Sequence, residues 1–218
     1  MEKSFWLERW QRGEIGFHEA DVNQYLLKHW QALNVPKGKR VFVPLCGKSY
    51  DMRWLRQQGY SILGVELSHL AVQDFFAEAG HQPQRHAVGE FEYHQADDIG
   101  ILCGDFFHLK RDDLQDVAAV YDRASMVALP PEMRERYVQH LVKTLPRPAQ
   151  ILLITFDYPQ SEMEGPPFAV SFAEVKKLYG DYADIQQLAQ IDVLDANSRF
   201  KQRGMTRLQE VITLLTLR

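Results

Sequence analysis

The chain has 218 residues, a formal net charge of −4 and two cysteines. This length suits a single α/β domain spanning residues 1–218, and two cysteines cannot build a disulfide framework, so we expect a reducing, cytoplasmic environment. The acidic balance, with no basic stripe and no apolar run of membrane-spanning length, argues against nucleic-acid and membrane partners and favours a small-molecule ligand.

Residues 1–34 show helical periodicity that is interrupted once. Trp6 and Trp10 share one helical face, residues 13–18 break the pattern, and apolar residues then return at helical spacing. Aromatic faces can attract a sulfonium cation or stack on a flat acceptor, so this segment is a candidate helical lid, with Trp10 and Phe17 facing a ligand. The alternative is that these rings simply fill the core.

Residues 39–66 carry the most informative pattern in the chain. We predict a buried strand over 41–45, a turn at Cys46-Gly47, a helix over 49–58, and a second buried strand over 61–66. Glu66 ends that second strand, where a carboxylate can accept hydrogen bonds from the two hydroxyl groups of a ribose. The pattern is typical of a nucleoside-binding β-α-β unit, although Glu66 can also cap the next helix or lie in solvent.

Two phosphate-binding motifs are incomplete in this region. Gly47-Lys48-Ser49 matches the end of a P-loop, but Phe42 stands where that motif requires a glycine. Gly47 is also the one glycine present of the three that a dinucleotide fingerprint needs. A nucleoside without a pyrophosphate, such as S-adenosylmethionine (AdoMet), needs no more than this sparse turn.

Strands and helices alternate along the rest of the chain. The predicted elements are a helix over 68–80, a hairpin over 91–107 whose second arm joins the sheet, a strand over 117–121, a helix over 130–145, a strand over 151–156, a helix over 171–180, and antiparallel strands over 185–193 and 207–217. Such alternation predicts a Rossmann-like α/β fold with helices on both faces of a mostly parallel sheet. The C-terminal antiparallel hairpin resembles the class I methyltransferase plan, for which we expect seven strands.

Three further residues lie at predicted strand ends. Asp105 and Phe106 can offer polar and apolar contacts to an adenine, or can be a helix cap beside a core phenylalanine. Arg123 leaves a buried strand tip and should have a defined anionic partner, either a ligand or a structural carboxylate.

Metal chemistry and nucleic-acid methylation find little support. His18, His69, His81 and His86 have no spacing typical of a metal site, so we predict no metal requirement. Residues 165–168, Gly-Pro-Pro-Phe, resemble the signature of amino methylases of nucleic-acid bases but follow the fifth predicted parallel strand, so we interpret them as a rigid loop beside the acceptor.

Several strings together resemble the thiopurine S-methyltransferase family, in particular its shorter bacterial form. They run through the whole chain: Trp6-Leu-Glu-Arg-Trp10, Phe17-His18, Arg40-Val-Phe-Val-Pro-Leu-Cys-Gly-Lys48, Gly64-Val-Glu66, Tyr121-Asp-Arg123, Gly165-Pro-Pro-Phe168 and the closing Thr-Leu-Leu-Thr-Leu. The Pro-Leu-Cys-Gly-Lys string is far more specific than an isolated glycine pattern.

The resemblance implies an AdoMet-dependent methyltransferase that acts on sulfur in aromatic and heterocyclic thiols and releases S-adenosylhomocysteine. Selenium and tellurium compounds are further acceptors that it suggests. The cofactor site would then comprise Trp10, Leu45, Glu66, Asp105, Phe106 and Arg123, and the acceptor would meet Phe17 and Arg199. No residue is assigned as a catalytic acid or base, and Arg123 would position either the acceptor or the cofactor's carboxylate.

Two other functions stay open on sequence alone. Oxygen or nitrogen acceptors have a higher pKa than thiols and normally need a positioned base, which separates that class of methyltransferase from a sulfur methylase. A non-catalytic nucleoside-binding protein on the same fold would bind the cofactor without turnover. We expect a monomer, because no surplus apolar helix or strand edge requires a partner.

Overall fold

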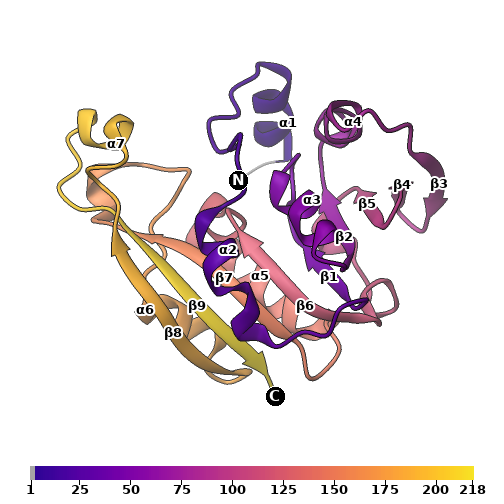
Figure 1. The fold of residues 1–218 in the computed structure, drawn as a ribbon. Coiled ribbons are helices and arrows are strands. Elements are labelled where there is room, and N and C mark those ends of the chain that lie inside the picture. Colours follow the sequence, from indigo (N-terminus) through magenta and orange to yellow (C-terminus); the bar gives the residue numbers. More distant parts are fainter. Residues whose placement is uncertain (1–2) are drawn as a thin grey trace.

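The computed structural model describes residues 3–218, apart from the side chains at positions 198 and 199. It contains one nine-stranded sheet in the order β3-β4-β5-β2-β1-β6-β7-β9-β8 (Figure 1). The strands are β1 (Arg40–Val43), β2 (Ser61–Glu66), β3 (Gln84–Val88), β4 (Phe91–Ala96), β5 (Ile99–Cys103), β6 (Val117–Arg123), β7 (Gln150–Asp157), β8 (Ala183–Asp192) and β9 (Gln209–Leu217).

Helices separate most of these strands. The α-helices are α1 (Lys3–Gln11), α2 (Gln24–His29), α3 (Tyr50–Gln57), α4 (His69–Glu78), α5 (Pro131–Thr144), α6 (Phe172–Tyr179) and α7 (Ser198–Gln202). Short 3₁₀ turns add η1 (Trp30–Leu33), η2 (Phe106–His108), η3 (Arg111–Leu114), η4 (Met126–Ala128) and η5 (Gln160–Glu162).

The central five strands, β5-β2-β1-β6-β7, are mutually parallel, and an antiparallel pair flanks them on each side. This arrangement confirms the Rossmann-like class and the C-terminal hairpin, but the expected count of seven strands is wrong. An additional strand, β3, pairs antiparallel with β4 at the sheet's edge and was not predicted from the sequence. Four of its five residues are exposed, so β3 has no buried face that a hydrophobic pattern could reveal.

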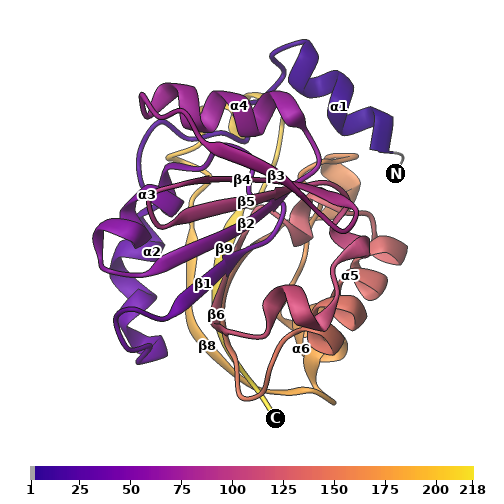
Figure 2. The same ribbon diagram turned by 90° about the vertical axis from the view of Figure 1, so that its right-hand side faces the viewer.

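Helices cover both faces of the sheet (Figure 2). One core layer packs α5 and α6 against the sheet around Tyr137, Leu141 and Val175. The other packs α2, α3 and α4 around Leu26, Met52, Phe75 and their neighbours. Each layer buries large aliphatic and aromatic side chains, so the sheet is held rigidly between them and its strand ends have fixed positions.

The predicted helix boundaries are confirmed where capping residues mark them. Ser49, Ser68 and Ser171 each accept a backbone N–H from the first turn of α3, α4 and α6 respectively. The first strand ends earlier than predicted, at Val43, because Leu45 has φ of 46° and has left the extended region.

None of the described helices is long and apolar enough to cross a membrane.

Candidate functional site

The carboxyl ends of the parallel strands bring four sequence-predicted positions to one edge of the sheet: Leu45, Glu66, Asp105 and Arg123. Leu45 follows β1, Glu66 ends β2, Asp105 follows β5, and Arg123 ends β6. In an open α/β sheet this edge is where ligands bind, so the strand order alone gathers residues that are up to 78 positions apart.

The backbone at this edge is strained. Leu45 and Ala124 have φ of 46° and 68°, values that side-chain-bearing residues rarely adopt. The Ser125 hydroxyl, which is fully buried, donates a hydrogen bond of 2.9 Å to the carbonyl of Pro44 and so joins the two strained turns. Strain of this kind, held in place by the surrounding structure, is concentrated at ligand-binding sites.

Glu66 is the best-defined polar group of the site. Only 6% of the residue is exposed, and its two carboxylate oxygens accept the backbone N–H groups of Gly47 and Ser68, each at 2.8 Å. Burial raises the pKa of the Glu66 carboxyl, and these N–H donors oppose the rise. The side chain therefore both caps the following turn and fixes the glycine turn after β1.

The Glu66 carboxylate has capacity for a ligand as well. An ionised carboxylate offers about four acceptor positions, and the Gly47 and Ser68 N–H groups occupy one on each oxygen. A ribose diol needs one acceptor position for each hydroxyl, so the residue present fits a nucleoside at this edge.

Aromatic residues of the N-terminal segment lie directly against the turn after β1. A Cβ placed on Gly47 would lie 3.2 Å from the Trp10 ring. Trp10 is itself buried and meets Phe17 edge-to-face at 5.7 Å, and Phe17 meets Trp6 in the same way. The structure thus brings Trp10 to the turn at the strand-tip edge, with Phe17 packed on it.

Two ion pairs tie the N-terminal segment to the same edge. The Arg123 guanidinium pairs with Glu19, and Lys3 Nζ lies 2.6 Å from Asp105 Oδ2. Burial alone would raise the pKa of Asp105, but the Lys3 ammonium and the Phe107 N–H outweigh that effect and lower it. Sequence patterns gave no signal for Lys3 or Glu19, because their roles depend on how the segment folds back over the sheet.

Asp105 and Phe106 make the contacts of a helix cap and of a core phenylalanine, which was the structural alternative to a role in ligand binding. The Asp105 carboxylate caps η2 by accepting the Phe107 N–H at 2.9 Å. The Phe106 ring is 3% exposed and stacks on Tyr137 at 4.7 Å, within the core layer beneath the sheet. An adenine at this edge would therefore meet the backbone of residues 105–106 rather than the Phe106 ring.

Two further residues from the sequence analysis complete the description. Lys48, the lysine of the incomplete P-loop motif, pairs with Glu78 at 2.6 Å and with Asp74 at 3.5 Å. The prediction for Arg199 concerns a side chain outside the described part of the chain.

Comparison with known proteins identifies the family. The whole chain, residues 1–218, matches the profile described as thiopurine S-methyltransferase (TPMT). The chain belongs to the thiopurine S-methyltransferase family. A relative of that name from Nitrosospira multiformis is 62% identical over 219 residues, covering 100% of this chain and 99% of the relative. Another from Xanthomonas axonopodis pv. citri is 50% identical and covers 100% of both chains.

Solved structures agree with the fold that this family implies. An AdoMet-dependent methyltransferase from Anabaena variabilis has a TM-score of 0.67 at 13% identity, covering 99% of this chain and 95% of its own. The 1,6-didemethyltoxoflavin-N1-methyltransferase of Burkholderia thailandensis was solved with S-adenosylhomocysteine. It has a TM-score of 0.66 at 11% identity, and the match covers 98% of this chain and 86% of that protein. These structural similarities establish that this member of the thiopurine S-methyltransferase family has the class I methyltransferase fold.

Proposed function

We propose that this protein transfers the methyl group of AdoMet to the sulfur of thiopurines and related heterocyclic thiols. The observation that carries the proposal is the buried Glu66 carboxylate at the tip of β2, fixed by two backbone N–H groups and opposite the strained turn after β1. The family membership supports the same activity, since relatives up to 62% identical bear the name thiopurine S-methyltransferase.

Each residue of the edge has a role in this proposal. Glu66 holds the ribose, and the backbone of the turn around Leu45 and of residues 105–106 lies along the rest of the nucleoside. Trp10 covers the glycine turn, and Phe17, which packs on Trp10, faces the acceptor. Arg199 stays a prediction for the acceptor end.

AdoMet supplies an electrophilic methyl group on a sulfonium sulfur. Heterocyclic thiols are substantially ionised near neutral pH, so the protein need not provide a strong general base for them. Its contribution is alignment and exclusion of water by Trp10 and Phe17, and well-oriented reactants can gain about 7–11 kcal/mol from such positioning.

Arg123 has an exchangeable partner. Glu19, whose side chain is 47% exposed, can release the guanidinium when an anionic acceptor or the carboxylate of the cofactor enters. An arginine side chain that is 17% exposed and held at a strand tip is well placed for such an exchange, because its fork of donors matches a carboxylate and its positive charge attracts a thiolate.

A matched acceptor series tests the function. Radiolabelled AdoMet is offered with a mercaptopurine, a hydroxypurine and an aminopurine of the same ring, and with an aryl thiol, an aryl selenol and a phenol. We expect label on the sulfur acceptors and none above background on the oxygen and nitrogen analogues. Preferential labelling of the hydroxy or amino compound would make the protein a methyltransferase of another class, and cofactor binding without turnover on any acceptor would make it a binding protein.

We also propose a cytoplasmic monomer. Cys46 and Cys103 are both free and buried, which suits a reducing compartment. Light scattering coupled to size-exclusion chromatography tests the oligomeric state, with a mass of 25.3 kDa expected for the monomer.

A further inference from the structure

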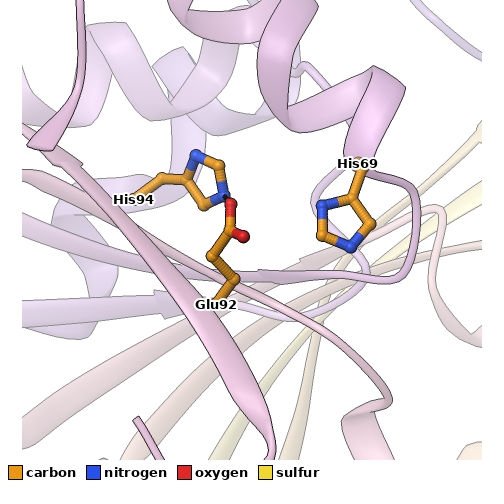
Figure 3. A group of neighbouring side chains, drawn as sticks. All are labelled: His69, Glu92 and His94. Atoms are coloured by element: carbon orange, nitrogen blue, oxygen red, sulfur yellow. Dashed lines mark ion pairs between the residues drawn. The ribbon is translucent and has the colours of Figure 1, made fainter. Parts of the chain in front are cut away.

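Three potential metal ligands come together two strands along the sheet from Glu66 (Figure 3). His69 of α4 and Glu92 and His94 of β4 each offer one ligand atom, and these atoms all lie within 4.8 Å of one another. Their spacing in the sequence gave no indication of this, because the helix and the strand meet only in the folded chain.

The fold explains why the three side chains meet. Glu92 and His94 are two positions apart on β4, so they point to the same face of the sheet. Helix α4 covers that face, since its Phe76 ring stacks on the His94 ring with centroids 6.5 Å apart. His69 is the first residue of α4, directly after the N-cap Ser68, and its side chain lies near the same strand.

His94 is the residue that points to a ligand. Its side chain is 1% exposed, yet neither ring nitrogen has a hydrogen bond of good geometry to any described residue. Nε2 lies only 2.5 Å from Glu92 Oε1, but the two groups do not meet in hydrogen-bond geometry. A buried ring nitrogen without a well-formed hydrogen bond is costly, and an ion that Nε2 and the Glu92 carboxylate both coordinate would satisfy that nitrogen.

One charged neighbour bears on metal binding at this cluster. Arg85 of β3, paired with His94 in the strand register, is a cationic neighbour that acts against a bound cation.

We infer that His69, Glu92 and His94 form a binding site for a divalent transition metal, with Zn²⁺ as the best match. Two imidazoles and one carboxylate are a known zinc ligand set that leaves a fourth position for water, with bonds of about 2.0–2.2 Å. Both His69 and Glu92 are exposed, so their side chains can adjust around an ion held by the buried His94.

The cluster lies along the same edge of the sheet as Glu66 but at a distance from it. Cys103 of β5 pairs with Glu66 on one side and with Glu92 on the other. Glu92 is therefore two strands away from Glu66, or about 10 Å. A metal here would tie α4 to the outer strand β4, so we expect it to stabilise the fold without being needed for turnover.

Equilibrium titration tests the site directly. Chelator-treated protein is titrated with Zn²⁺ in competition with a chromophoric chelator, and with Co²⁺ while its visible spectrum is recorded. We expect one ion per chain, a tetrahedral Co²⁺ spectrum without thiolate charge-transfer bands, and a rise in Tm with Zn²⁺. Methyl transfer by the metal-free protein should equal that of the loaded protein.

Single substitutions locate the ligands. His69→Ala and Glu92→Gln alter exposed side chains, so the fold should persist, and each should weaken Zn²⁺ binding by roughly a hundredfold or more, since even loss of an outer-shell partner costs about 10–100-fold. His86→Ala is the matched control, because His86 pairs with Tyr93 on the opposite face of the same hairpin. Arg85→Gln should tighten binding.

Three results would overturn the inference. One is a wild-type protein that takes up no Zn²⁺ at stoichiometric concentration. Another is Zn²⁺ affinity that is the same in His69→Ala as in His86→Ala. The third is a Co²⁺ spectrum with strong thiolate bands, which would place the ion on Cys46 or Cys103.

Discussion

At the scale of single residues, opposing effects act on the pKa of the Glu66 carboxyl. Burial favours its neutral form, whereas the N–H groups of Gly47 and Ser68 favour its charged form. The carboxylate is thus prepared to accept two more donors without reorganising, which is the kind of preorganisation that binding sites use.

Removing this carboxylate should weaken cofactor binding. Hydrogen bonds to a charged acceptor contribute about 1.5–3 kcal/mol, so Glu66→Ala should lower the affinity for S-adenosylhomocysteine by about tenfold or more. Calorimetric titration measures the change, with Glu135→Ala, an exposed acid on α5, as the control. An unchanged Kd in Glu66→Ala would remove Glu66 from the site.

Gly47 is a second residue where the geometry makes a specific demand. Gly47 and Gly13 both have positive φ, of 52° and 67°, but only a Cβ on Gly47 would press on Trp10. Both alanine variants should lose about 1–2 kcal/mol of unfolding free energy through backbone strain, and only Gly47→Ala should also lose cofactor affinity. Denaturant unfolding and ligand titration separate the two effects. Equal ligand affinities in the two variants would argue against the contact between Trp10 and the turn.

At the scale of elements, the tip of β6 carries a buried acid beneath Arg123. Asp122 is fully buried and accepts the Tyr137 hydroxyl from α5 at 2.6 Å. Burial raises the pKa of Asp122 from 3.8 to about 6, against the effect of that hydrogen bond. The strand tip is therefore fixed to the helix layer below it at some cost in stability near neutral pH.

The raised pKa of Asp122 sets the direction of a pH effect on stability. A carboxyl whose pKa is higher in the folded state stabilises the fold below its unfolded pKa of 3.8, and this contribution is lost as the pH rises through about 6. Between pH 3.5 and pH 7 the wild type should therefore lose ~3 kcal/mol of unfolding free energy relative to Asp122→Asn. Parallel stability curves for the two proteins would contradict this assignment.

The N-terminal segment is the second element that the site depends on, through the pair between Arg123 and Glu19. If Arg123 also contacts a ligand, Arg123→Ala should lower kcat/KM for an aryl thiol by roughly tenfold, whereas Glu19→Gln should change it by less than about fivefold, since half-exposed ion pairs contribute about 1 kcal/mol or less. Steady-state kinetics of the two variants measures both changes in kcat/KM. Equal losses would restrict Arg123 to holding the segment.

The sequence predicted the elements with strong local signals and missed those without them. The β-α-β unit ending at Glu66 has buried strands and capping residues, and the structure confirms it. The edge strand β3 has a polar, exposed sequence, and its place is decided by pairing with β4. The partners Lys3 and Glu19 and the cluster around His94 were missed for a related reason: each depends on contacts between distant segments.

At the scale of the whole molecule, the parts converge on one edge. Two core layers hold five parallel strands whose carboxyl ends present Glu66, the turn after β1 and Arg123, while the N-terminal segment covers them. The net charge of −4 does not favour a polyanionic partner. A heterocyclic thiol is already ionised near neutral pH, so the protein needs to align it with the cofactor and needs no strong general base.

A crystal structure of the complex with S-adenosylhomocysteine tests this account most directly. We predict that both ribose hydroxyls donate to the Glu66 carboxylate, and that the cofactor's sulfur lies on the side of Phe17 and Arg123. A nucleoside bound elsewhere, or a ribose that does not touch Glu66, would contradict it.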